Sequence, residues 1–162
     1  MKTFAVLLCI ILTSCATKKI KNSDFVEIDQ NLKVEILNEP TDGGTIDFLR
    51  LFALDQNVSN VIIEFDTNKS IRLSFDHTDF KERQFKVFEG KFKRKFFEVF
   101  LEKKRIVFPP IYWISQIKRL RISISKDSTL VVEHYWDHSG MILFMGAGSS
   151  SKTYHQYALI EK

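Results

Sequence analysis

The chain has 162 residues, of which 44 % are hydrophobic and 27 % are charged. This composition is typical of a folded globular domain and excludes a disordered chain. The formal net charge of +4 is small and its basic residues are interspersed with acidic ones, so nothing in the charge favours nucleic-acid binding.

The first fifteen residues have the three zones of an export signal. Lys2 supplies a positive start, residues 4–12 are uncharged and apolar, and Thr13-Ser14-Cys15 is a small-residue end. A run this short predicts a signal peptide, because a membrane-spanning helix needs about 20 apolar residues. Leu12-Thr13-Ser14-Cys15 resembles the lipobox of bacterial lipoprotein precursors. The alternative is an ordinary secretory signal cut nearby, in which Cys15 is incidental.

The lipobox resemblance implies that residues 1–14 are removed and that Cys15 receives lipid, with palmitate among its acyl chains. Cys9 leaves with the signal peptide, so the mature chain has no second thiol and no internal disulfide. No Asp follows Cys15, and the resemblance then implies an outer-membrane anchor facing the periplasm. Membrane contact through the lipid on Cys15 is the first expected partnership.

Residues 15–44 are expected to form the lipidated N-terminus and tether, and residues 45–162 a β-barrel domain. Weak alternation at residues 32–37 fits either a short strand or part of the tether. Residues 40–44 contain Pro, Asp and two Gly and predict a turn. Apolar positions in 46–54 follow a helical spacing behind a possible N-cap at Thr45, which predicts a helix of one to three turns.

From Asn60 onwards the apolar pattern has a period of two, which predicts eight strands. They are expected at 61–65, 71–75, 85–92, 97–101, 120–124, 130–136, 141–146 and 153–160. Most of the connections are too short for parallel crossovers, so the strands are expected to run antiparallel and up and down. Gly90 within a strand predicts a bulge or bend.

One consistently apolar strand face is best hidden when such a sheet curls into a barrel. The sequence therefore predicts a mainly β fold: an eight-stranded antiparallel up-and-down, lipocalin-like barrel preceded by one short helix. Arg119, Arg121, Ser123 and Glu133 are expected to face water, and a second set is expected to be buried: Leu120, Ile122, Ile124, Leu130 and Val132. A membrane-spanning barrel is disfavoured, because charged residues such as Arg121 and Glu133 would have to fill its lumen.

Three segments carry a second resemblance: Phe-Glu-Gly-Lys-Phe at 88–92, Pro-Pro-Ile-Tyr-Trp at 109–113 and Asp-His-Ser-Gly at 137–140. Together with the helix and the strand order they resemble small lipoproteins with a lipocalin-like barrel. The Gly-x-Trp of true lipocalins is missing, so the resemblance implies the architecture more than ligand binding.

The sequence contains no motif that supports catalysis, and no enzyme activity or cofactor is expected. His134 and His138 are four residues apart, but on a strand that spacing separates them by roughly 13 Å, so no metal site is expected there. The polar run from Asp76 to Asp79 is expected to be an ordinary hairpin loop. Cations and aromatics from Lys91 to Phe97 fit a charged hairpin tip.

The segment from Lys103 to Gln116 is predicted to be the longest loop of the domain and the first choice for a functional surface. Its Ile111, Tyr112 and Trp113 are the candidate ligand or partner residues. The alternative is a lid that folds over one barrel end and buries Trp113. The expected function is that of a lipid-anchored, non-catalytic structural or interaction module of the cell envelope, with a protein partner. The alternative function is a lipocalin-like carrier of a small apolar ligand in a hollow barrel.

Overall fold

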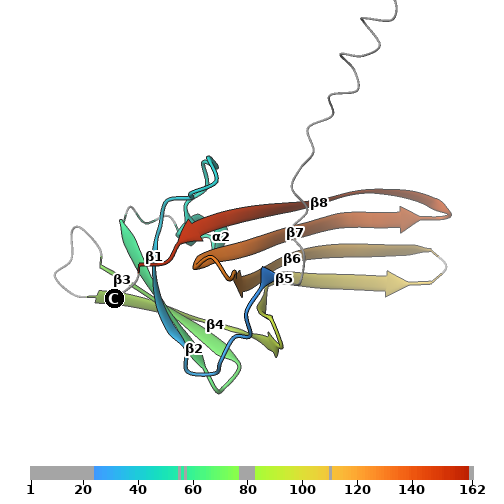
Figure 1. Cartoon of the computed structure of the whole chain (residues 1–162). Coiled ribbons are helices and arrows are strands. Elements are labelled where there is room, and N and C mark those ends of the chain that lie inside the picture. The colour runs from blue at the N-terminus through green and yellow to red at the C-terminus, as the bar shows by residue number, and fades with distance from the viewer. Residues whose placement is uncertain (1–23, 55, 57, 77–82, 110, 161–162) are drawn as a thin grey trace, which may run out of the picture.

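The computed structural model describes residues 24–54, 56, 58–76, 83–109 and 111–160 (Figure 1). Within these residues the chain forms one short helix, α2 (Phe48–Leu51), and eight strands. The strands are β1 (Lys33–Leu37), β2 (Asn60–Asp66), β3 (Ser70–Asp76), β4 (Arg83–Lys93), β5 (Phe96–Phe108), β6 (Tyr112–Ile124), β7 (Thr129–Ile142) and β8 (Met145–Ala158).

Every strand pairs antiparallel with the next one along the chain, in the order β1 to β8. The predicted up-and-down antiparallel fold is therefore confirmed, and the sheet curls into a half-barrel. Its first and last strands meet where Ile36 bridges to Leu159 and the Ile160 N–H donates to the Glu35 carbonyl at 2.8 Å. The predicted helix of one to three turns is present as a single turn.

Several predicted boundaries are wrong. Lys33–Leu37 forms β1, so the folded part begins before residue 45. The expected long loop from Lys103 to Gln116 is a hairpin, because β5 continues to Phe108 and β6 begins at Tyr112. Residues 137–140 and 147–151, which separate predicted strands, lie inside β7 and β8, and the strand predicted at 141–146 contains the turn between them.

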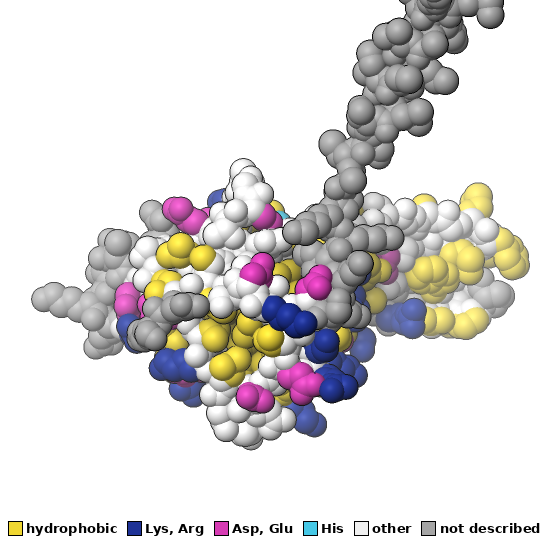
Figure 2. All heavy atoms as spheres, in the orientation of Figure 1, with side chains coloured by type: hydrophobic (Ala, Val, Ile, Leu, Met, Phe, Trp, Pro, Cys, Tyr) yellow, Lys and Arg dark blue, Asp and Glu magenta, His cyan; other side chains and the backbone are white. Residues whose placement is uncertain are grey.

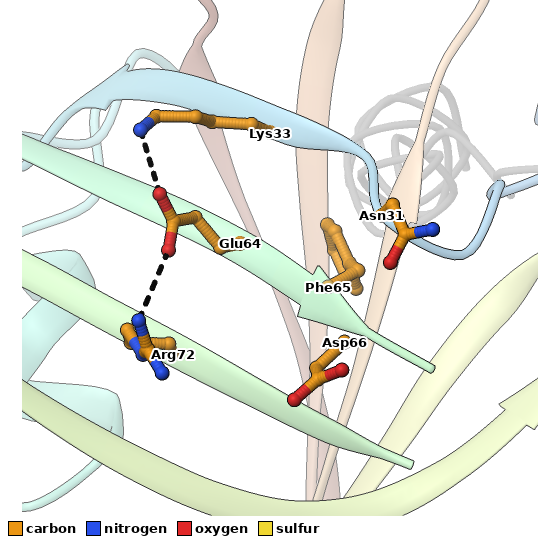
Figure 3. A pocket seen from close by; sticks show the side chains of 6 residues that line it. All are labelled: Asn31, Lys33, Glu64, Phe65, Asp66 and Arg72. Carbon is orange, nitrogen blue, oxygen red and sulfur yellow. Dashed lines mark ion pairs between the residues drawn. The ribbon is translucent and has the colours of Figure 1, made fainter. Parts of the chain in front are cut away.

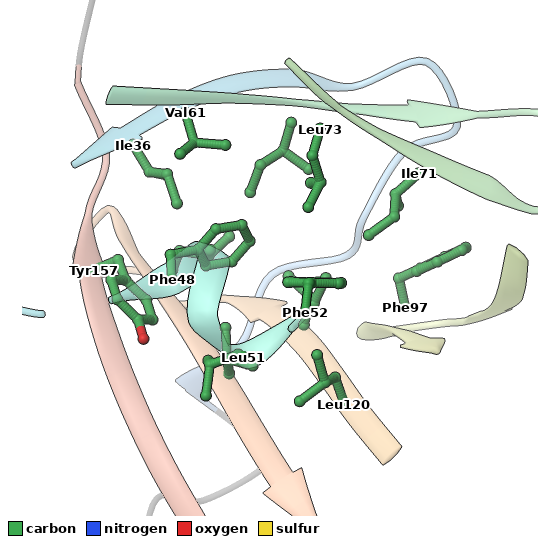
Figure 4. Close-up of a cluster of buried hydrophobic side chains, with 14 of the residues drawn as sticks. Ile36, Phe48, Leu51, Phe52, Val61, Ile71, Leu73, Phe97, Leu120 and Tyr157 are labelled. Atoms are coloured by element: carbon green, nitrogen blue, oxygen red, sulfur yellow. The ribbon is translucent and has the colours of Figure 1, made fainter. Parts of the chain in front are cut away.

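The concave side of the half-barrel is filled by side chains (Figure 4). Phe48, Leu49 and Phe52, from α2 and the residue after it, are buried there against the strands. Phe48 packs edge-on against Tyr157 with ring centroids 5.3 Å apart, and Phe52 lies 4.8 Å from Phe88. The helix thus acts as a plug for the sheet. The predicted register is also confirmed, since these core positions are all buried: Leu120, Ile122, Ile124, Leu130 and Val132.

Asn38, between β1 and α2, positions the plug. Its carbonyl accepts the Phe48 N–H at 2.8 Å and its side-chain oxygen accepts the Leu49 N–H at 3.0 Å. Its side-chain amide donates to the Val58 carbonyl, also at 3.0 Å. The N-cap of the helix is Asp47, which makes no side-chain capping bond, and not the expected Thr45. A buried asparagine from outside the helix therefore satisfies the backbone N–H groups that a capping side chain normally satisfies.

Gly90, where a bulge or bend was expected, lies at the point where β4 changes partner. Glu89 pairs with Ser70 of β3, whereas Gly90 pairs with Val99 of β5. A Cβ at residue 90 would lie 2.5 Å from the Phe97 ring, so only glycine lets the two strands approach this closely.

Candidate functional site

Four strands extend beyond the half-barrel as one sheet (Figure 1). A register shift in β5 between Phe100 and Glu102 marks where this extension begins. We call the extension the distal sheet and define it as Glu102–Phe108, Tyr112–Lys118, Trp136–Ile142 and Met145–Ser151. Its strands stay in register with one another up to the two hairpin turns at its far end.

The distal sheet is a single layer. Among its described residues only Ser115 is buried, and its other side chains are half-buried or exposed on both faces. Domains normally bury the apolar side chains of a sheet against a second layer. The distal sheet has no such layer in the described part of the chain, so its apolar side chains remain available for contact.

Apolar side chains gather at the far end of the distal sheet (Figure 2). Phe144 is 84 % exposed and Met145 77 % exposed. We call this cluster the hairpin tip and define it as Val107, Phe108, Ile111, Ile142, Leu143, Phe144 and Met145. The Leu143 N–H donates to the Ile111 carbonyl at 2.8 Å, so the two hairpins form one tip.

An open apolar groove of about 720 Å³ lies next to the tip. Its lining includes Trp113 and Ile114 of β6 and Trp136 of β7. On β8 the neighbouring side chains are small, and a Cβ at Gly148 would lie 2.5 Å from the Ser139 Cβ. Ala147 and Ser149 of β8 pair with Gly140 and His138, and their small side chains leave the groove open beside Trp136; Trp113 belongs to the opposite face of the sheet.

A cluster of charged residues joins β5, β6, β7 and β8 just before the distal sheet begins. Arg121 Nε lies 2.7 Å from Glu98 Oε2, and Arg119 and Lys152 pair with Glu133 at 3.3 and 3.1 Å. Arg119, Arg121 and Glu133 lie on the outer face, as the alternation predicted, and their side chains are partly covered. Ser123 was also expected to face water, but it is buried. Both carboxylates are held by cations from neighbouring strands, so these ion pairs join the strands.

A second pocket, of about 260 Å³, lies over β1 to β3 and is polar (Figure 3). Glu64 points between Lys33 at 2.6 Å and Arg72 at 3.8 Å. Asp66 accepts hydrogen bonds from the Thr67 hydroxyl and the Asn68 N–H. The acidic groups of this pocket are therefore engaged by their own chain.

Three histidines lie within the described residues, all of them on β7 or β8. His134 and His155 are near one another, and burial lowers the pKa of both imidazoles. His138 is on β7 beside Gln116, with 3.2 Å between the two side-chain nitrogens. No group of three or more potential metal ligands occurs in the part of the chain that the structure describes. The run from Asp76 to Asp79 lies largely outside the described residues.

The three candidate contact residues chosen from the sequence lie together at the distal end. Ile111 is in the hairpin turn, and Tyr112 and Trp113 begin β6. Trp113 pairs with Val107 and Met141 in the distal sheet, so it does not cover an end of the half-barrel as the lid alternative required. Leu143 and Phe144 were missed, because nothing in a Leu-Phe pair predicts an exposed hairpin turn.

Cys15, the predicted lipidation site, lies outside the described residues. Comparison of the chain with protein-family models, curated proteins and solved structures finds no match. Among the described helices, none has both the length and the apolar character needed to cross a membrane.

Proposed function

We propose that this protein is a lipid-anchored, non-catalytic interaction module of the cell envelope, and that the distal sheet is its contact surface. The observation that carries the proposal is the uncovered apolar tip of a single-layer sheet. Large exposed apolar patches on folded domains mark contact sites, since an isolated domain gains nothing by exposing them. The lipobox at Leu12–Cys15 supports the proposed location, which is an outer-membrane anchor facing the periplasm.

A carrier of a small apolar ligand is the second candidate. The interior of the half-barrel is a poor place for such a ligand, because Phe48, Leu49 and Phe52 occupy it. The open groove beside Trp136 is favoured by its volume of about 720 Å³, which falls in the range of small-molecule sites. A carrier would therefore bind its ligand on the distal sheet and not inside the curled sheet.

The anchor is tested by Cys15→Ala. We expect the variant to leave the membrane fraction, because it has no residue to receive the lipid. Normal processing and membrane retention of Cys15→Ala would show that the lipoprotein assignment is wrong.

The contact surface is tested by photo-crosslinking in cells, with a photoreactive amino acid in place of Phe144. The matched control is Phe85 of β4, which is 62 % exposed but lies outside the distal sheet. Crosslinks from position 144 that position 85 does not give support the proposal. Equal yields from the two positions contradict it.

A further inference from the structure

We infer that the hairpin tip inserts into the interfacial region of a lipid bilayer that carries anionic lipids. The inference rests on the proposed function, in which the distal sheet is the contact surface. It names the partner of that surface from the shape and the charge of the tip.

The turn between β7 and β8 places two large apolar residues in a strained backbone conformation and exposes both of them. Leu143 and Phe144 have φ angles of +45° and +72°. A two-residue hairpin turn of this kind favours Asn-Gly, because bulky side chains are strained at positive φ. Two large apolar residues at these positions, both exposed, do not help the domain fold. Their exposed side chains are suited to contact with an apolar partner such as lipid.

Apolar side chains project from both faces of the tip. Tyr112 is in one cross-strand row with Phe108 and Ile142. The next row, on the opposite face, joins Trp113 to Val107 and Met141. A protein packed against the sheet would cover one of these faces, whereas a bilayer surrounds an inserted tip on every side. The two-faced pattern therefore favours lipid as the partner.

The polar groups behind the tip set the depth of insertion. Three rows from the end are apolar, and they extend over roughly 10 Å at 3.3 Å per residue. Ser115 and Gln116 of β6 follow them. The outer edges of β5 and β8 also carry backbone groups with no neighbouring strand along the distal sheet as described. Such groups are costly in hydrocarbon, so insertion stops at interfacial depth, where Trp and Tyr are favoured.

A basic belt lies behind the apolar rows. Lys103, Lys104 and Arg105 are consecutive, exposed residues of β5. No Asp, Glu, Lys or Arg occurs in residues 106–117 or 138–151, so the distal end itself carries no formal charge. With the tip inserted, the belt lies at the level of the lipid headgroups, where cations attract anionic lipids.

The test uses the mature chain from residue 15 with Cys15→Ala, so that neither a lipid anchor nor the apolar residues 4–12 contribute to binding. Sedimentation with vesicles of phosphatidylcholine, with and without phosphatidylglycerol, measures the partition coefficient. We expect binding to the anionic vesicles, weakened by salt. Trp113 is in the second apolar row, so a blue shift of its fluorescence reports insertion, whereas Trp136 pairs with Lys118 behind the basic belt and should not shift.

The decisive variant is Leu143→Asn with Phe144→Gly. It gives the turn its preferred residues, so thermal stability should be kept or raised while the exposed apolar groups are lost. Binding should fall roughly tenfold or more. The matched control is Phe85→Ser, which removes an exposed phenylalanine elsewhere and should bind like the parent chain.

The charge requirement is tested by the triple change Lys103→Gln, Lys104→Gln and Arg105→Gln. It should remove most of the salt dependence of binding. A control of equal charge on β4 should leave the salt dependence unchanged: Lys86→Gln, Lys91→Gln and Lys93→Gln.

Failure of the parent chain to bind anionic vesicles overturns the inference, as does equal binding of the folded Asn-Gly variant. The proposed function fails separately. If the chain does not bind vesicles but position 144 still crosslinks to a protein in cells, the distal sheet is a contact surface and lipid is not its partner. If tip-dependent association of the chain with itself replaces vesicle binding, the partner is a second copy.

Discussion

Asn38→Ala should destabilise the domain far more than its small change in volume suggests. Asn38 is 2 % exposed, and its side chain makes two of the bonds that hold α2 against the sheet. Alanine leaves the N–H of Leu49, which is itself fully buried, without an acceptor. It also leaves the Val58 carbonyl without this donor.

Each unsatisfied buried group costs about 1–3 kcal/mol. Since the Val58 carbonyl is only partly buried, we expect a total loss of about 2–4 kcal/mol in the free energy of unfolding. That is a large fraction of the roughly 5–15 kcal/mol available to a domain.

Urea unfolding of the non-lipidated chain measures this loss. The matched control is Asn60→Ala, whose side-chain amide donates to Glu35 at 3.3 Å in an exposed position. The control should stay within about 0.5 kcal/mol of the parent chain. Equal losses from the two variants, at an unchanged dependence on urea, would refute the role given to Asn38.

Three further predictions follow from the same structure. Leu120→Ala should cost about 2–5 kcal/mol in a urea titration, because Leu120 is fully enclosed in the core. Trp113→Ala should cost less than about 1 kcal/mol, since Trp113 lies beyond that core, yet it should weaken vesicle binding. Because burial lowers the pKa of His134 and His155 in the fold, the unfolded chain binds protons more readily; stability should be complete above the unfolded value near pH 6.5 and fall as the pH is lowered through it. Replacing both histidines with Gln should flatten that part of a pH–stability curve.

Alternation predicted the strands where the sheet has one buried face. Leu120, Ile122 and Leu130 line the core, and Arg121 and Glu133 line the other face. Such a pattern arises only when one side is buried and the other is solvated. In the distal sheet neither face is buried, so folding does not require apolar and polar residues to alternate along its strands. This is why residues 103–116 and 147–151 have the composition of loops although they form strands.

Turn chemistry misled the prediction in a related way. Asp137 to Gly140 has the composition of a turn but pairs along β7, where Asp137 accepts hydrogen bonds from the hydroxyls of Ser115 and Ser139. The real turn, at Leu143 and Phe144, has the composition of a strand. Sequence rules for turns assume that the residues were selected for folding. At the hairpin tip the residues Leu143 and Phe144 are unfavourable for the turn that they form. Such conflicts between sequence and fold are expected where a surface has a function other than folding.

The position of the anchor constrains how the tip can meet a membrane. Phe25 bridges to Ser125, so the N-terminal segment joins the domain at the end of β6 that lies roughly 40 Å from Tyr112. The chain from Cys15 to Asp24 spans at most about 30 Å. A lipid on Cys15 and the hairpin tip can therefore share one bilayer only if the long strands are inclined to its surface. An upright domain would present its tip to a second bilayer, and clustering of vesicles by the lipidated protein separates the two arrangements, because only the upright one joins two vesicles.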